Sequence, residues 1–142
     1  MIIEKFDKQD VPQLVELYKE LTPFENSLDS ADEFYRKIAK NPNYLLLTAK
    51  ENNEIIGSAC GFIMNSLYSG GKPILFIDSV VVKQNSRRMG IGSNLFFKLD
   101  EFAKKNHASC AIFVSTAFRV ATHEFYKSVG FINDVRGFRK EY

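Results

Sequence analysis

The sequence predicts a single α/β domain over residues 1–142, with a mixed central sheet flanked by helices. Three observations predict this class. The chain is long enough for one hydrophobic core but not two, and its 45% hydrophobic and 25% charged residues match an ordinary soluble domain. Strand-like and helix-like segments alternate, without internal repeats or Pro/Gly-rich linkers. Near the middle, a strand, a helix and a strand follow one another within about forty residues, which is typical of a right-handed parallel crossover.

The first half is expected to hold two helices and a meander of strands. One helix is expected from Asp10, a candidate N-cap followed by Pro12 in the first turn. A second is expected from Ser30, which would form a capping box with Glu33. The apolar positions predicted to face the core are Leu14, Leu17, Tyr18 and Leu21, then Phe34 and Ile38. The expected strands are Ile2–Phe6, Tyr44–Ala49, Ile55–Met64 and Ile74–Val82.

The second half is expected to continue with helices and strands in alternation. A helix over Gly90–Lys105 would bury a stripe that begins at Ile91, and a strand would follow over Ser109–Ser115. A last helix over Ala121–Val129 would end at Gly130, a suitable residue just past a helix end. The final expected element is a strand near Val135–Lys140.

Charge is divided unevenly along the chain. Residues 1–60 carry seven Lys/Arg and eleven Asp/Glu, a net charge of −4, whereas residues 61–142 carry twelve and six, a net charge of +6. The second half would suit an anionic ligand, although scattered surface charges would give the same numbers. Cys60 and Cys110 lie in apolar segments and are expected to be packed thiols, not metal ligands. No leader or membrane-spanning segment is evident, so a cytoplasmic location without membrane partners is expected.

The most informative stretch runs from Val80 to Ser93, where an apolar strand leads through a polar turn into two arginines, two glycines and a helix. Glycines let the backbone approach a ligand, and the amides at a helix start favour anions. Glycines at helix starts also serve packing, so this feature alone is weak. A Walker A loop is excluded because no Gly-Lys-Ser/Thr follows, and a dinucleotide fingerprint lacks its third glycine and its acidic partner.

The segment Arg87-Arg88-Met89-Gly90-Ile91-Gly92 resembles the Arg/Gln-x-x-Gly-x-Gly/Ala signature of the GCN5-related N-acetyltransferase (GNAT) superfamily. A second landmark of that family, a helix with an aromatic-Tyr pair that ends in Gly-Phe, is similar to Phe125–Phe131. The order of predicted elements agrees from the first strand to the last. The resemblance implies that the chain is an acetyl-coenzyme A-dependent N-acetyltransferase that needs no metal.

The resemblance also implies which residues hold the acetyl-CoA. Backbone groups of Val80, Val81 and Val82 would pair with the pantetheine. The pyrophosphate would lie against Arg87, Arg88, Met89, Gly90, Ile91, Gly92 and Ser93. Phe125 and Tyr126 would contact the cofactor from the last helix. Arg119 stands where many relatives have Asn, and some relatives carry Arg there, so it is included in the cofactor set.

An alkyl amine has a pKa near ~10.4, so a proton acceptor is needed at neutral pH. Asp78 interrupts an apolar strand, where burial would raise its pKa toward a useful range; the alternative is a solvated or structural carboxylate. Glu25 is a second candidate base or an ammonium-binding group. Tyr126 would protonate the departing thiolate, unless it is only a core aromatic. Phe24, Glu25 and Tyr68 are the expected acceptor-binding residues.

The acceptor is expected to be the primary amine of a small molecule or peptide. It would be cationic if the acids Glu25, Asp29, Asp32 and Glu33 form an acidic mouth; the alternative is that these acids only solvate a helix start, where negative charge is favourable. A coenzyme A-binding module without catalysis is the alternative function. Nucleic-acid binding is disfavoured, because the basic residues are not interleaved with stacking aromatics. His107 is expected to be a solvated helix-end residue, and a homodimer is common in the family.

Overall fold

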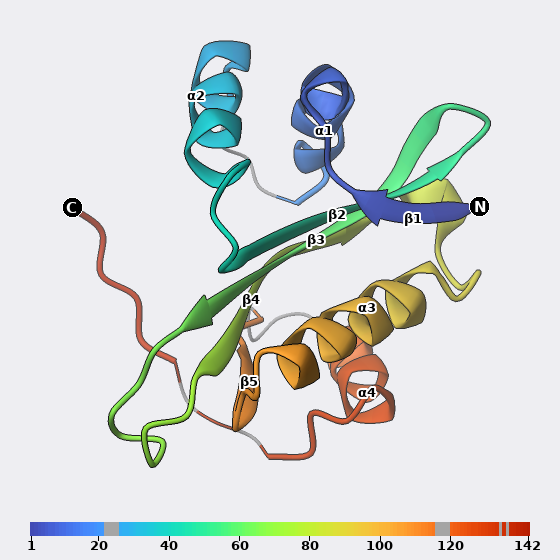
Figure 1. Cartoon of the computed structure of the whole chain (residues 1–142). Coiled ribbons are helices and arrows are strands. Elements are labelled where there is room, and N and C mark those ends of the chain that lie inside the picture. Colours follow the sequence, from blue (N-terminus) through green and yellow to red (C-terminus); the bar gives the residue numbers. More distant parts are fainter. Residues whose placement is uncertain (22–25, 116–119, 134, 136) are drawn as a thin grey trace. The chain divides into compact units, whose positions relative to one another are not determined.

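A five-stranded mixed sheet organises the structure, with strand order β1-β2-β3-β4-β5 (Figure 1). This computed structural model describes residues 1–21, 26–115, 120–133, 135 and 137–142. The first four strands pair antiparallel in chain order, and β5 follows β4 after a helix. The strands are β1 (Ile2–Lys5), β2 (Tyr44–Glu51), β3 (Glu54–Met64), β4 (Ile74–Val82) and β5 (Cys110–Phe113). The predicted mixed sheet is therefore confirmed.

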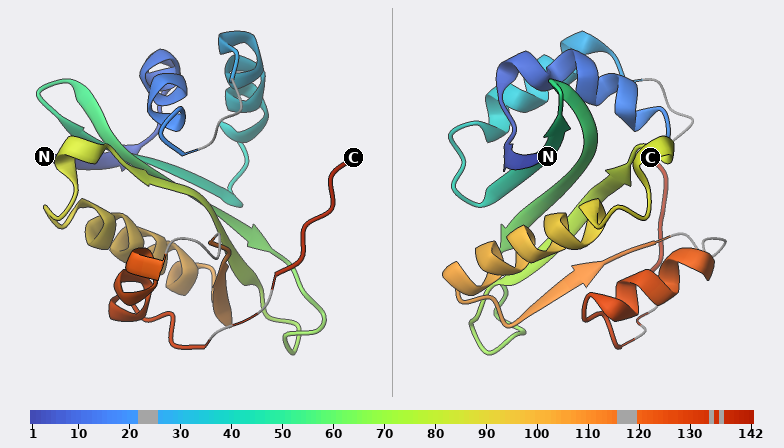
Figure 2. Two further views of the ribbon diagram at one scale, coloured as in Figure 1. Left: turned by 180° about the vertical axis from the view of Figure 1, so that it is seen from behind. Right: turned by 90° about the vertical axis from the view of Figure 1, so that its right-hand side faces the viewer.

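Contact clustering divides the chain into two compact units, Met1–Ile112 and Phe113–Tyr142. In the first unit, helices α1 (Val11–Tyr18) and α2 (Leu28–Ile38) cover one face of the sheet and α3 (Ile91–Lys105) covers the other (Figures 1 and 2). A Cβ placed on Gly57 of β3 would lie 2.9 Å from Ile91, and one on Gly61 would lie 2.8 Å from Leu99. From Gly57 onward, odd-numbered β3 residues therefore face α3 and even-numbered ones face α1 and α2.

Each face of the sheet has its own apolar core. On the α3 side, the helix buries the stripe that its periodicity predicts and adds Phe96, which is 2% exposed. On the other side, Leu14 and Leu17 of α1 and Ile38 of α2 form one cluster with Ile55 and Cys60 of β3 and Val81 of β4. The two glycines of β3 let α3 approach closely, because any side chain there would meet the helix.

The first helix begins as expected, with Asp10 at the N-cap position of α1 and Pro12 in the first turn. Asp10 makes no side-chain cap to α1, because a short 3-10 turn over Lys8–Asp10 precedes the helix, and Asp7 and Asp10 form the capping box of that turn. The start of α2 differs from expectation by about one turn. Ser27, not Ser30, caps α2, because its side chain accepts from the Ser30 amide at 3.1 Å. The buried face of α2 is formed by Ala31, Tyr35 and Ile38, and Phe34 lies off this face at 42% exposure, so its predicted burial is wrong.

The second unit contains α4 (Val120–Ser128), which ends as predicted at Gly130 with φ of 101°. The Phe131 amide donates to the Tyr126 carbonyl at 3.0 Å and the Gly130 amide donates to Lys127 at 3.0 Å, which is a Schellman ending. The strand expected near Val135–Lys140 is not found among the described residues of that segment, which have no regular secondary structure.

Candidate functional site

The turn from β4 into α3 exposes backbone amides at a helix start. Arg88 and Gly90 have left-handed φ values of 65° and 77°. Gly90 occupies the N-cap position and supplies no side-chain cap, so the first amides of α3 have no covering side chain from that residue. A Cβ on Gly90 would meet nothing closer than Asn94 at 3.9 Å, so a side chain would fit in the space available. Glycine is favoured here because of the positive φ. This arrangement suits an anionic group.

The two arginines before this helix differ in their surroundings. The Arg87 Nε donates to the Val82 carbonyl at 3.1 Å, and its guanidinium lies 3.5 Å from the Glu20 carboxylate. Glu20 also accepts from the Gln84 amide at 2.9 Å. Arg87 therefore helps to hold the turn against α1, while Arg88 is exposed. Both remain candidates for phosphate binding.

A β-bulge interrupts β4 just before this turn. Ser58 pairs with Val81 and Cys60 with Asp78, so Ser79 and Val80 together oppose one residue of β3. Ser79 has a left-handed φ of 55°, which is unusual for a residue other than glycine. Beyond the bulge, Val81 is buried while Val80 and Val82 are half-buried. The Ser109 amide donates to the Pro73 carbonyl, so β5 begins beside the start of β4.

Asp78 lies at the bulge and is exposed, so of the two alternatives that the sequence left open, a buried or a solvated carboxylate, the structure has the solvated one. Asp78 stands opposite Cys60, so both side chains lie on the face of the sheet that α1 and α2 cover. Asp78 is nevertheless exposed, because those helices cover less of β4 than of β3 (Figure 1). The Ser79 hydroxyl donates to Asp78 Oδ2 at 2.8 Å. The carboxylate is therefore accessible to solvent and is oriented by Ser79. It does not lie in an apolar pocket.

Two further titratable groups lie beside the bulge. Tyr18 is partly buried against the core cluster that contains Cys60 and Val81, and burial raises the pKa of its hydroxyl well above the ordinary value. Burial and then the Asp78 charge raise the pKa of the Cys60 thiol to about 12. Cys60 is thus a packed, protonated thiol, as expected. Cys110 is exposed, so the expectation of packing is wrong for it.

Sequence reasoning missed Ser79 and assigned Tyr18 to the core only. Nothing in the sequence marks Ser79 as left-handed, because glycine or Asn is the usual signal for such a conformation. The polar pair formed by Asp78 and Ser79 inside an apolar strand is the available signal for a bulge. His107 is exposed beyond the end of α3, as predicted.

Tyr126 lies within an aromatic cluster of the second unit. Its ring packs edge-on against Phe113, with centroids 4.6 Å apart, and against Phe125 at 5.6 Å. Phe113 also contacts Phe131 at 6.1 Å. The Gly-Phe landmark that follows the helix therefore has a structural role in ending α4 and closing this cluster. The role of Tyr126 toward a thiolate stays a prediction.

Several predicted site residues are not tested by the structure. Phe24, Glu25 and Arg119 lie outside the described residues. Tyr68 is 97% exposed in the link between β3 and β4 and contributes to no described pocket. Among the described residues, no group of three or more His, Cys, Asp or Glu is arranged to hold a metal ion. None of the helices described has the length and apolar content that crossing a membrane requires.

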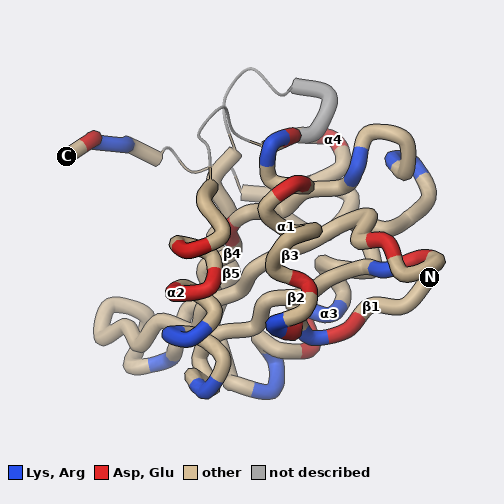
Figure 3. Tube along the Cα trace, turned by 90° about the horizontal axis from the view of Figure 1, so that it is seen from above, with Lys and Arg blue, Asp and Glu red and all other residues tan. Residues whose placement is uncertain are grey.

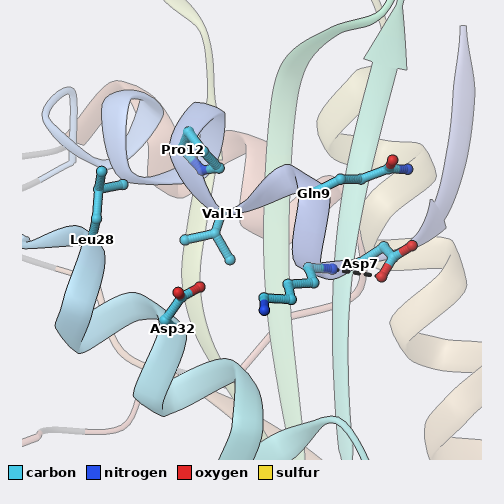
Figure 4. Close-up of a pocket in the computed structure, with 7 residues that line it drawn as sticks. Asp7, Gln9, Val11, Pro12, Leu28 and Asp32 are labelled. Atoms are coloured by element: carbon cyan, nitrogen blue, oxygen red, sulfur yellow. Dashed lines mark hydrogen bonds between the residues drawn. The ribbon is translucent and has the colours of Figure 1, made fainter.

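A hollow lies between the starts of α1 and α2 (Figure 4). Its lining residues are Asp7, Lys8, Gln9, Val11, Pro12, Leu28 and Asp32. Asp7 is already engaged there, since it caps the preceding turn and accepts from the Tyr35 hydroxyl at 3.3 Å. The hollow shares no residue with the β4 bulge or the turn into α3. We assign it no part in the candidate site.

The acids of the first half are partly matched by basic neighbours. Lys37 lies 2.8 Å from Glu33 and lowers the pKa of that carboxyl, and Lys19 lies 2.6 Å from Glu16. Asp29 stands in the first turn of α2, where the helix dipole favours it. Seen from above, acidic and basic segments are interspersed (Figure 3). The described residues thus supply individual carboxylates, not one continuous acidic field.

Comparisons with known proteins agree on one family. The model described as "Acetyltransferase (GNAT) family" matches residues 11–131. Human spermidine/spermine N(1)-acetyltransferase-like protein 1 is 26% identical over 85% of this chain, which spans only 19% of that protein's length. A candidate acetyltransferase from Agrobacterium tumefaciens has a TM-score of 0.90 at 25% identity, with both chains fully covered. An aminoglycoside N-acetyltransferase solved in complex with CoA has a TM-score of 0.85 at 16% identity, covering 99% of this chain and 93% of that chain.

Proposed function

Because this chain belongs to the acetyltransferase (GNAT) family, we propose that it transfers the acetyl group of acetyl-CoA to a primary amine. The family resemblance drawn from the two sequence motifs is thereby confirmed. The family match runs through both compact units, which supports treating residues 1–142 as one acetyltransferase domain. Acetyl-CoA supplies an activated thioester, and the chain's own residues must bind it, orient the amine and move protons.

The main support for the proposal is the order of backbone features along β4 and into α3. The bulge at Ser79 disturbs regular pairing, and the left-handed Arg88 and Gly90 then present an uncapped helix start. The backbone of Val80, Val81 and Val82 lies between these features, where the pantetheine is expected. Amides at the start of α3, together with Arg88, suit the negative pyrophosphate. The residues present therefore fit coenzyme A.

Asp78 is the proposed proton acceptor for the amine. Its carboxylate is exposed at the bulge and is fixed by the Ser79 hydroxyl, so it can take a proton directly or through a water molecule. Its accessibility suits an incoming ammonium group, which must lose a proton before it can attack. Glu25 remains the alternative candidate from the sequence. Cys60 is excluded as the acceptor of this proton, because its thiol stays protonated.

Tyr126 is the proposed proton donor to the departing thiolate. The support is its place in the family's second motif, before the Gly-Phe that ends α4. The aromatic cluster around its ring limits the rotation of the side chain, which favours a fixed position for the hydroxyl. Phe125 would support the same position from the preceding residue.

The experiment that tests the function is a thiol-release assay with acetyl-CoA and a panel of amines. The panel should contain polyamines, since the human relative is named for spermidine and spermine, together with aminoglycosides, amino acids and short peptides. Amine-dependent release of CoA supports the proposal. Tight binding of CoA without amine-dependent release from any member would support a non-catalytic binding module instead.

A further inference from the structure

Four aromatic residues are successive neighbours on the first unit, and we call them the aromatic row: Phe34, Tyr44, Phe62 and Phe76. Tyr44 of β2 stands directly opposite Phe62 of β3, and Phe62 stands opposite Phe76 of β4. The Tyr44 and Phe62 ring centroids are 4.6 Å apart. Phe34 of α2 packs edge-on against Tyr44 at 6.4 Å. The row therefore crosses three strands and reaches one helix.

The aromatic row lies on the α1 and α2 face of the sheet. Phe62 has the same parity along β3 as Cys60, which packs in the core beneath α1, whereas Gly61 faces α3. The row is only partly covered: Phe76 is 38% exposed and Phe34 is 42% exposed, while Tyr44 and Phe62 are half-buried. Large apolar groups that are exposed side by side often mark a binding site.

Asp78 ends the row on β4. It follows Phe76 by two positions, so both side chains stand on the same face, about 7 Å apart along the strand. Tyr18 of α1 packs against the core cluster that contains Cys60, the β3 partner of Asp78. An exposed carboxylate thus lies at the end of the aromatic row. This combination suits an ammonium group attached to an apolar body.

We propose that the aromatic row binds the body of the acceptor, and that the acceptor is a small primary amine carrying an aromatic or branched alkyl group. The inference rests on the proposed function, with the amine nitrogen at Asp78. The spacing along β4 fits a nitrogen that lies on the order of 5–7 Å from the centre of its apolar group. A polyhydroxylated amine would lose hydration against these rings without gaining hydrogen bonds from them.

The test compares two amines that differ in their bodies: 2-phenylethylamine and ethanolamine, with spermidine as a third acceptor. In the thiol-release assay, kcat/KM for 2-phenylethylamine should exceed that for ethanolamine by roughly 10- to 100-fold, because burial of a phenyl ring contributes that order of selectivity. Equal or better use of ethanolamine or spermidine would overturn the inference while leaving the proposed function intact.

The variant that isolates the row is Phe76→Ala, with Phe34→Ala as a second variant on a different element. Each should lower the ratio of kcat/KM for 2-phenylethylamine over ethanolamine by about 5- to 30-fold. Phe97→Ala is the matched control, because Phe97 is a 59% exposed phenylalanine on α3, the helix of the opposite face. An unchanged ratio in both row variants, or an equal fall in the control, would contradict the inference.

A binding measurement separates this inference from failure of the catalytic proposal. Calorimetric titration of 2-phenylethylamine into the full chain with CoA present should show saturable binding that Phe76→Ala weakens by about the same factor. If no amine is acetylated but this binding is seen, the aromatic row stands and the proposed function fails. If 2-phenylethylamine does not bind and is not acetylated, the aromatic row is not an acceptor site.

Discussion

Asp78 and Ser79 are two polar residues in the otherwise apolar strand β4, and Asp78 is exposed to solvent. A left-handed residue other than glycine costs on the order of 1 kcal/mol, so the surroundings must hold Ser79 in place. Pairing of β4 with β3 on both sides of the bulge does so, and the Ser79 hydroxyl gains a hydrogen bond to Asp78. The left-handed conformation of Ser79 is therefore the source of both the backbone strain and the orientation of the Asp78 carboxylate.

Replacing Ser79 by Gly separates these two effects. Glycine accepts the left-handed conformation but removes the hydrogen bond to Asp78, so the free energy of unfolding should change by less than about 1 kcal/mol. Turnover should nevertheless fall by roughly 10-fold, because the carboxylate loses its orientation. Thermal denaturation and the thiol-release assay measure the two quantities.

Asn53→Gly is the control for Ser79→Gly, since Asn53 is also left-handed, with φ of 63°, in the turn between β2 and β3. It should leave both stability and turnover nearly unchanged. Full activity of Ser79→Gly would show that Asp78 needs no orientation from Ser79.

The two cysteines should react at very different rates with a thiol reagent. Burial raises the pKa of the Cys60 thiol from its ordinary value to about 12, so its reactive thiolate is scarce at pH 8, whereas Cys110 is exposed. Mass spectrometry should find one label on the native chain and two on the denatured chain. Rapid labelling of Cys60 in the native chain would contradict its burial.

Tyr126→Phe tests the proposed proton donor. Loss of an acid catalyst should lower kcat by about 100-fold while leaving the affinity for CoA within about 2-fold, as measured by calorimetry. Tyr142→Phe removes the hydroxyl of an exposed tyrosine that has no part in the proposed site and should change neither quantity. Unchanged turnover of Tyr126→Phe at every pH would mean that solvent protonates the thiolate.

At the scale of elements, the segments with strong periodicity were predictable and their ends were less so. The bounds of β4 and the start of α3 agree with expectation, because an apolar run and a glycine pair mark them. The start of α2 differs because Ser27 and Ser30 are both acceptable caps, and only the fold selects Ser27. The expected last strand has the right residue types, but strand formation also requires a partner, which the sequence does not specify.

Gly90→Val tests the role of the α3 start. A β-branched residue at φ of 77° is strained, so the turn should rearrange and CoA affinity should fall by at least about 100-fold. Calorimetry measures the affinity, and circular dichroism should still report a folded chain. Gly71→Val, at φ of 76° in the link between β3 and β4, is the matched control and should retain CoA binding. Unchanged affinity of Gly90→Val would remove the helix start from the site.

At the scale of the whole molecule, the proposed assignment uses different parts of the first unit for the two substrates. The helix start of α3 serves the phosphates, the opposite face carries the aromatic row, and β4 with its bulge lies between them. The proposed phosphate site could be predicted from the sequence, because its glycines and arginines form a recognisable motif before α3. For the acceptor, the sequence indicated Phe24, Glu25 and Tyr68, and it did not predict the aromatic row, because the row joins residues from α2, β2, β3 and β4 that only the sheet register brings together.

The most direct test of the central claim is mass spectrometry of the amine after incubation with acetyl-CoA and the full chain, comparing the native chain with Asp78→Asn. The account predicts one acetyl group on the amine for each CoA released, and a rate for Asp78→Asn lower by about 100-fold with unchanged CoA affinity. An amine that stays unmodified while CoA binds tightly would contradict acetyl transfer. Full activity of Asp78→Asn would remove Asp78 as the proton acceptor.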